Sequence, residues 1–98
     1  MNVLEEANNI IYGEREKDYG TVTENFTRIA VGWEQILGCK VSPQQVGLCM
    51  AWLKIARECN GHKYDNIVDL AGYAGTIGKY YDEQEEAFKN TKVGLELL

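Results

Sequence analysis

Apolar residues recur at steps of three and four through most of this 98-residue sequence, and this spacing predicts amphipathic helices. The segment 21–37 presents one broad apolar face and begins with a capping box, Thr21-Val22-Thr23-Glu24. The segment 43–59 is apolar nearly all round and follows a second capping box that starts at Ser42. Because no strand-like alternation of useful length interrupts this pattern, the sequence predicts an all-α fold.

Helices are expected over residues 2–17, 21–37, 43–59 and 64–88, followed by an ambiguous tail at 89–98 whose apolar residues could dock on a partner chain or fray. A chain of this length supports one hydrophobic core, so residues 1–98 are expected to form a single domain resembling a four-helix bundle. The nearly all-apolar helix 43–59 is expected to be its central and most buried element. Residues 83–86 are expected to be a solvated extension of the last helix.

Two features predict a homo-oligomer, at least a dimer. Four short helices leave little surface to cover Trp33 and the apolar residues of helix 43–59. Helix 64–88 also carries Gly72, Gly75 and Gly78, each of which weakens a helix by ~1 kcal/mol relative to alanine. Such a cost suggests that a neighbouring helix or a ligand approaches the backbone closely there.

Fifteen acidic residues against ten basic ones give a formal net charge of −5. A binder of duplex DNA or RNA normally has the opposite sign, so duplex nucleic acid is not expected as a partner, whereas a few placed cations can still hold a small anion. The sequence has neither an apolar run of the ~18 residues that span a membrane nor the start of a signal peptide. Cys39, Cys49 and Cys59 have a spacing typical of free thiols in a reducing compartment. We therefore expect a cytoplasmic protein with no membrane partner.

Charged residues stand where the helical pattern predicts a core. Arg57 shares a stripe with apolar residues of its helix, and Lys54 lies beside it. Because an unpaired buried charge is costly, Arg57 is expected to meet an acid or an anionic ligand, the alternative being that it snorkels to solvent. Asp65 and Asp69 are four residues apart, so a positive group is expected close to them. Asp18 continues the apolar stripe of the first helix, unless that helix has run past its partner there.

Several motifs follow one another in a set order: Arg15-Glu16-Lys17-Asp18-Tyr19-Gly20, Glu24-Asn25-Phe26, Trp33, Leu53-Lys54-Ile55-Ala56-Arg57, His62-Lys63-Tyr64-Asp65-Asn66, Asp69 and Gly72-Tyr73. In this order they resemble a small all-helical family of phage and prophage proteins of unknown function, over about residues 4–81. More distantly, the sequence is similar to the nucleotide-modification-associated helical domains of phages. Through them it is similar to MazG-like all-α nucleoside triphosphate pyrophosphohydrolases.

The distant resemblance implies a site in which carboxylates from two helices hold magnesium against a triphosphate. Asp65 and Asp69 could stand in for one carboxylate pair, at a spacing of four instead of three. The other pair is missing, because the second helix offers Asn25 and Arg28 in its place. If the protein is an enzyme, the expected magnesium ligands are Asp18, Asp65 and Asp69. The missing carboxylate pair on the second helix argues against hydrolysis and leaves nucleotide binding open.

Three functions follow, in order of preference. The first, suggested by the phage resemblance, is a non-catalytic binder without a cofactor that sequesters a phosphorylated or cyclic nucleotide signal in the cytoplasm of the bacterial host. Its expected ligand-binding residues are Arg15, Lys54 and Arg57 on phosphates, Tyr19 and Tyr73 stacked on a base, Asn25 at the base edge, and the acidic neighbours Asp18, Asp65 and Asp69. The second is a magnesium-dependent pyrophosphohydrolase. The third is an interaction module without a ligand, in which Arg15 and Arg57 pair with the three aspartates.

Overall fold

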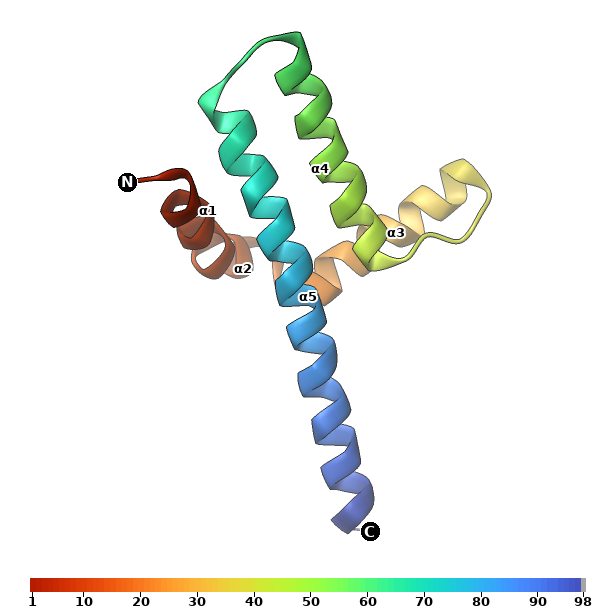
Figure 1. Ribbon diagram of the computed structural model, residues 1–98. Coiled ribbons are helices and arrows are strands. Elements are labelled where there is room, and N and C mark those ends of the chain that lie inside the picture. Colours follow the sequence, from red (N-terminus) through yellow and green to blue (C-terminus); the bar gives the residue numbers. More distant parts are fainter. Residues whose placement is uncertain (98) are drawn as a thin grey trace.

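The computed structural model describes residues 1–97, together with their side chains except those of Glu14 and residues 92–97 (Figure 1). Its helices are α1 (Val3–Tyr12), α2 (Glu14–Tyr19), α3 (Val22–Leu37), α4 (Pro43–Asn60) and α5 (Tyr64–Leu97). The described residues contain no strand, so the all-α prediction is confirmed. None of their helices is both long enough and apolar enough to cross a bilayer.

The first expected helix is broken in two at Gly13, so the prediction of one helix over residues 2–17 was wrong. Gly13 separates α1 from α2 with φ −113° and ψ −114°. A Cβ atom at this position would lie 2.5 Å from the carbonyl oxygen of Asn9, so the turn accepts only glycine. The break matters for the site, because it redirects the chain just before Arg15.

The predicted helix ends at the capping boxes and at Gly38 are confirmed. The Oγ atom of Thr21 accepts a hydrogen bond from the backbone N–H of Glu24 at 3.1 Å. Ser42 precedes α4 and its backbone N–H donates to Oε1 of Gln45 at 2.8 Å. Gly38 ends α3 in the left-handed region, with φ +70°. Local side-chain chemistry therefore decides where these helices begin and end.

The core lies where α3 crosses the antiparallel pair of α4 and α5 (Figure 1). The buried side chains of this cluster come from α3 and α4: Val22, Phe26, Ala30 and Val46. Gly47 lets α4 approach its neighbours closely, since a Cβ there would lie 2.5 Å from Cγ1 of Ile77 and 3.1 Å from Cε2 of Phe26. On the other side of α5, α1 packs against Gly75, where a Cβ would lie 2.5 Å from Cδ1 of Ile11. Close helix approach is thus confirmed at Gly75.

The prediction that α4 is the most buried helix was wrong for the single chain. Only Val46 and Gly47 of this helix are buried, whereas Leu48 is 58% and Trp52 69% exposed. The whole chain exposes 6902 Å², against about 5,700 Å² expected for a folded monomer of its mass. The oligomer that would cover this surface stays a prediction. Gly72 and Gly78 also face open space in the chain.

The last helix runs far beyond the bundle. It continues to Leu97, so the part of the expected tail that the structure describes is helical, while Leu98 lies outside the described residues. Its final third projects away from the other helices (Figure 1). The expectation that apolar residues of this tail dock or fray concerns side chains outside the described set. The prediction that residues 83–86 are solvated was wrong for Glu83. This residue is half-buried and accepts hydrogen bonds from the backbone N–H groups of Val22 at 3.2 Å and Thr23 at 2.8 Å.

Candidate functional site

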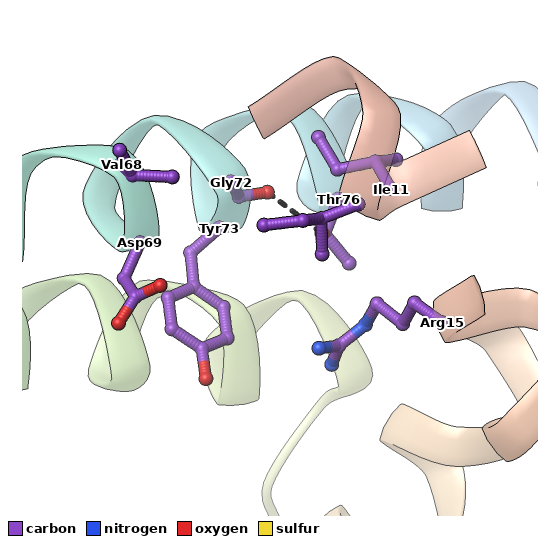
Figure 2. Close-up of a pocket in the computed structure, with 8 residues that line it drawn as sticks. Ile11, Arg15, Val68, Asp69, Gly72, Tyr73 and Thr76 are labelled. Carbon is purple, nitrogen blue, oxygen red and sulfur yellow. Dashed lines mark hydrogen bonds between the residues drawn. The ribbon is translucent and has the colours of Figure 1, made fainter. Parts of the chain in front are cut away.

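A small cavity lies between α5 and the two N-terminal helices, and it contains several of the predicted site residues (Figure 2). Its volume is about 100 Å³. Its lining side chains and backbone come from Ile10, Ile11, Arg15, Val68, Asp69, Gly72, Tyr73 and Thr76. We call it the Arg15 cavity, because the guanidinium of Arg15 is the cationic group in its wall.

Three aromatic rings surround the guanidinium of Arg15. Its central carbon lies 5.6 Å from the ring centroid of Tyr19, 5.9 Å from that of Phe26 and 5.8 Å from that of Tyr73. Among the described side chains, no carboxylate lies within 4.0 Å of it and no acceptor takes a hydrogen bond from it. Ring faces stabilise the cation without using its five N–H donors. Arg15 is therefore held in place with its donors available to an anion.

Asp69, on the opposite part of the cavity wall, is paired with Lys54. The Nζ atom of Lys54 lies 2.9 Å from Oδ2 of Asp69, and the lysine side chain is only 14% exposed. The expected positive neighbour of Asp69 is thus confirmed. This pairing also removes most of the repulsion that an unpaired carboxylate would exert on an anion in the cavity.

The expected partnership of Arg57 with Asp69 was wrong. Arg57 is exposed and lines a different hollow, beside His62 and Lys63 at the turn between α4 and α5. Lys54 is three residues earlier on α4 and so lies about 60° away around the helix, on the side that faces α5. The stripe that Arg57 shares is buried at Val46 but exposed at Leu53 and Arg57, so Arg57 needs no buried partner. The pairs expected of a purely structural module, with Arg15 and Arg57 bound to aspartates, do not form within the described residues.

The remaining predicted residues lie outside the cavity. Asp18 on α2 and Asp65 on α5 are exposed, and Asn25 on α3 is half-buried without lining the cavity. Across the described residues, no three His, Cys, Asp or Glu side chains gather closely enough to hold a metal ion. The magnesium ligands expected of an enzyme, Asp18, Asp65 and Asp69, are therefore not assembled within the chain.

Lys79, which was not predicted from the sequence, fixes the helix that carries Arg15. Lys79 is 8% exposed, and its Nζ atom donates to Oε2 of Glu16 at 2.8 Å and to the carbonyl oxygen of Ile11 at 3.3 Å. It also lies 4.9 Å from the ring centroid of Tyr12. One ammonium group thus binds the end of α1 and the side of α2 to α5, across the break at Gly13.

A signal for Lys79 and Glu83 was present in the sequence. Both continue the second face of α5, on which Asp69 and Thr76 lie at steps of three and four. A polar stripe on a helix is usually solvated, and here it meets the N-terminal helices instead. Thr76 on this stripe is buried and donates to the carbonyl oxygen of Gly72 at 2.7 Å, so its hydroxyl is satisfied within the helix.

The turn between α4 and α5 is held by Glu58. Its carboxylate accepts hydrogen bonds from the ring of His62, from the backbone N–H of Lys63 at 3.0 Å and from the amide of Asn66 at 3.3 Å. These donors, His62 first, lower the pKa of Glu58 below its usual 4.5. At the start of α5, a hydrogen bond to Glu6 is the main cause that raises the pKa of Tyr64 above 10.0.

The chain is similar to proteins of two mycobacteriophages. It is 41% identical over 90 residues to the Gene 55 protein of Mycobacterium phage L5, which is 90% of this chain and 58% of that protein. It is also 41% identical over 86 residues to the Gene 55 protein of Mycobacterium phage D29, covering 87% of this chain and 57% of that protein. The chain thus spans under two thirds of the length of these curated relatives.

No solved structure gives a significant match to the chain. The expected resemblance to phage proteins of unknown function is confirmed, while the more distant likeness to MazG-like pyrophosphohydrolases stays a prediction. Residues 2–81, which include the whole Arg15 cavity, match one described family. The chain belongs to the family described as domain of unknown function (DUF6378).

Proposed function

We propose that this protein binds a phosphorylated or cyclic nucleotide through the Arg15 cavity and keeps it intact, as a phage-encoded sponge for a signalling nucleotide in the cytoplasm of the bacterial host. The observation that supports this best is the state of Arg15. Its guanidinium is surrounded by three aromatic rings, and no carboxylate among the described side chains lies within 4.0 Å of it. Such a fork of donors matches the geometry of a phosphate group.

The size of the cavity limits which part of the ligand it can take. At about 100 Å³ it is well below the ~300–1,000 Å³ of ordinary small-molecule pockets. It therefore suits a phosphate group, with the sugar and base placed over the open mouth. Tyr19, which is 53% exposed beside Arg15, offers a ring for stacking there.

The charge distribution supports an anionic ligand in a chain that is acidic overall. Lys54 neutralises Asp69, so the cavity wall has a local positive excess at Arg15 although the net charge of the chain is −5. Long-range attraction is weak under these conditions, and affinity has to come from short-range contacts. We therefore expect recognition of a small phosphorylated molecule rather than of a polyanion.

Retention of the ligand without hydrolysis is proposed for a chemical reason. Cleavage of a triphosphate needs carboxylates that fix magnesium and a positioned water. The described residues do not bring three such ligands together. Phage relatives at 41% identity support placement of the chain in an infected bacterium, where sequestration of a host signal would serve the phage.

Mass spectrometry of small molecules released by heating the purified protein tests this proposal. We expect a phosphorylated nucleotide from the wild-type protein and from an Arg57→Met variant, and none from Arg15→Met. Arg57 is the matched control, because it is an exposed arginine outside the cavity. Equal release from both variants would contradict the proposed site, and recovery of a cleaved nucleotide would favour the enzymatic alternative.

A further inference from the structure

From Leu48 to Cys59, the outward side of α4 is an apolar surface that the described residues of the chain leave exposed. It consists of the exposed residues Leu48, Cys49, Trp52, Leu53, Ile55, Ala56 and Cys59, which we call the α4 outer face. None of them is charged. Leu48, Trp52, Ile55 and Cys59 follow one another at steps of four, three and four, which is the spacing of a helix-pairing seam.

The solvent-accessible surface of the chain is larger than that of an ordinary folded monomer. The exposed 6902 Å² exceeds by about 1,200 Å² the area expected of a folded monomer of this mass. A standard protein–protein interface takes ~800 Å² from each partner. The projecting third of α5 contributes to the excess, and the α4 outer face contributes its apolar part, with Trp52 69% exposed. The total excess is larger than the area that one partner contributes to a standard interface.

We propose that α4 packs antiparallel against α4 of a second copy of this chain, with Trp52 next to the two-fold axis. Trp52 lies at the midpoint of α4, which spans Pro43–Asn60, so this arrangement superimposes positions 48–56 of the two outer faces and puts Cys59 opposite Gln45 of the second copy. A two-fold interface has to be complementary to itself. An uncharged apolar face meets that condition, because no charge has to be desolvated or placed opposite a like charge.

The order of side chain sizes along the helix supports the antiparallel arrangement. With the axis at Trp52, Leu48 lies opposite Ala56 of the second copy, and Ile55 lies opposite Cys49 of the second copy. Leu48 and Ile55 thus each meet a smaller side chain on either side of the central tryptophan pair, which lets the two surfaces interdigitate. The tryptophan at the centre is the type of residue that anchors interfaces, surrounded by contacts that exclude water.

The proposed dimer leaves the Arg15 cavity accessible, so it is independent of the proposed function. Lys54, which reaches Asp69 in the cavity wall, lies about 200° around α4 from Trp52. The outer face and the side that packs on α5 are thus nearly opposite sides of one helix. Each dimer would carry two cavities, one in each copy.

Sedimentation velocity at tens of micromolar tests the proposal. The wild-type protein is expected to sediment at twice the 11.1 kDa of one chain, and Trp52→Glu at the mass of one chain. Leu4→Glu is the matched control, because Leu4 is 72% exposed on α1, which packs on α5 rather than on α4; it is expected to remain a dimer. Since Trp52 is exposed within the chain, its substitution should preserve helicity by circular dichroism. A wild-type monomer, or a dimeric Trp52→Glu, would overturn the proposal.

Disulfide formation tests the register and keeps Trp52 in place. In a chain with Cys39→Ser and Cys59→Ser, the substitution Ile55→Cys puts a thiol opposite the native Cys49 of the second copy. Residues 49 and 55 are ~9 Å apart along one helix, too far for a disulfide within a chain. Mild oxidation is expected to give a covalent dimer linked between positions 49 and 55. Thr27→Cys, on the exposed side of α3, is the control in the same background, and equal cross-linking by it, or none by Ile55→Cys, would overturn the antiparallel register.

Discussion

Lys54 and Asp69 join α4 to α5 beside the Arg15 cavity, through an ion pair in which Nζ and Oδ2 are 2.9 Å apart. The lysine side chain is 14% exposed and that of the aspartate 39%, so the pair is only partly screened by water. The two residues stabilise the contact between these helices and neutralise the carboxylate that would otherwise repel an anionic ligand. Fold and site thus depend on the same contact.

Removal of the Asp69 carboxylate is expected to lower the free energy of unfolding more than removal of the Lys54 ammonium does. Asp69→Ala leaves the ammonium of Lys54 without its partner and should lower the free energy of unfolding by about 1–2 kcal/mol, whereas Lys54→Met refills the volume and should cost less. Urea denaturation measures both. Glu85→Gln is the control, because the Lys89–Glu85 pair is over 60% exposed on both sides and should contribute no more than about 0.5 kcal/mol. Equal effects of Asp69→Ala and Glu85→Gln would contradict this role.

Lys79→Met is expected to weaken both stability and ligand binding. The ammonium of Lys79 bonds to the carbonyl oxygen of Ile11 and to Glu16, and loss of charged hydrogen bonds should lower the free energy of unfolding by about 1–3 kcal/mol. Because Glu16 is next to Arg15 on α2, loss of its contact with Lys79 should loosen the helix that carries Arg15. Ligand affinity should therefore fall severalfold under conditions in which the variant is still folded. Lys89→Met, on the exposed end of α5, should change neither. A fully stable Lys79→Met with unchanged affinity would show that this contact does not position α2.

Two glycine substitutions are expected to act in opposite directions. A methyl group at Gly47 would meet Ile77 at 2.5 Å and Phe26 at 3.1 Å, so Gly47→Ala should destabilise the protein by about 1–3 kcal/mol despite the better helix propensity of alanine. Gly78 has no atom within 4 Å of such a methyl group, so Gly78→Ala should stabilise it by up to ~1 kcal/mol. Thermal unfolding compares the two. A stabilising Gly47→Ala would mean that α4 and α5 are less closely packed than the structure shows.

The turn at Glu58 predicts a specific dependence on pH. Its pKa is lowered from 4.5 mainly by the hydrogen bond from His62, so the folded chain holds the charged carboxylate more strongly than the unfolded chain does. The stabilising contribution is present above about pH 4.5 and is lost as the pH falls through the lower, folded-state pKa. NMR titration of the Glu58 carboxyl carbon should give a pKa below 4.5, and His62→Ala should move it back toward 4.5. An unshifted pKa in the wild-type chain would contradict the hydrogen bonds at this turn.

Much of the fold was predictable from local chemistry. The capping residues Thr21 and Ser42 and the left-handed Gly38 end or begin helices where the sequence predicts, since these effects need only neighbouring residues. The break at Gly13 was missed because the apolar spacing continues past it. The burial of α4 was wrongly predicted, because the sequence of a helix that is apolar nearly all round does not show whether the same chain or another chain covers it.

The site was predicted in part. The structure brings Arg15, Tyr19 and Tyr73 together, three residues that the motif order had selected. Lys79 was not foreseen, because its partners lie more than sixty residues earlier in the sequence and a polar stripe alone does not identify them. Arg57 was selected on the premise that its stripe on α4 is buried along its whole length, but the stripe is buried at Val46 and exposed at Arg57.

Titration calorimetry with a panel of nucleoside mono- and triphosphates and cyclic dinucleotides, with and without magnesium, tests the central claim most directly. The account predicts that the wild-type protein binds at least one of them, that Arg15→Met weakens this binding at least tenfold while Arg57→Met does not, and that chromatography afterwards recovers the ligand intact. Absence of binding across the panel, or equal binding by the wild-type protein and Arg15→Met, would contradict a phosphate site at Arg15.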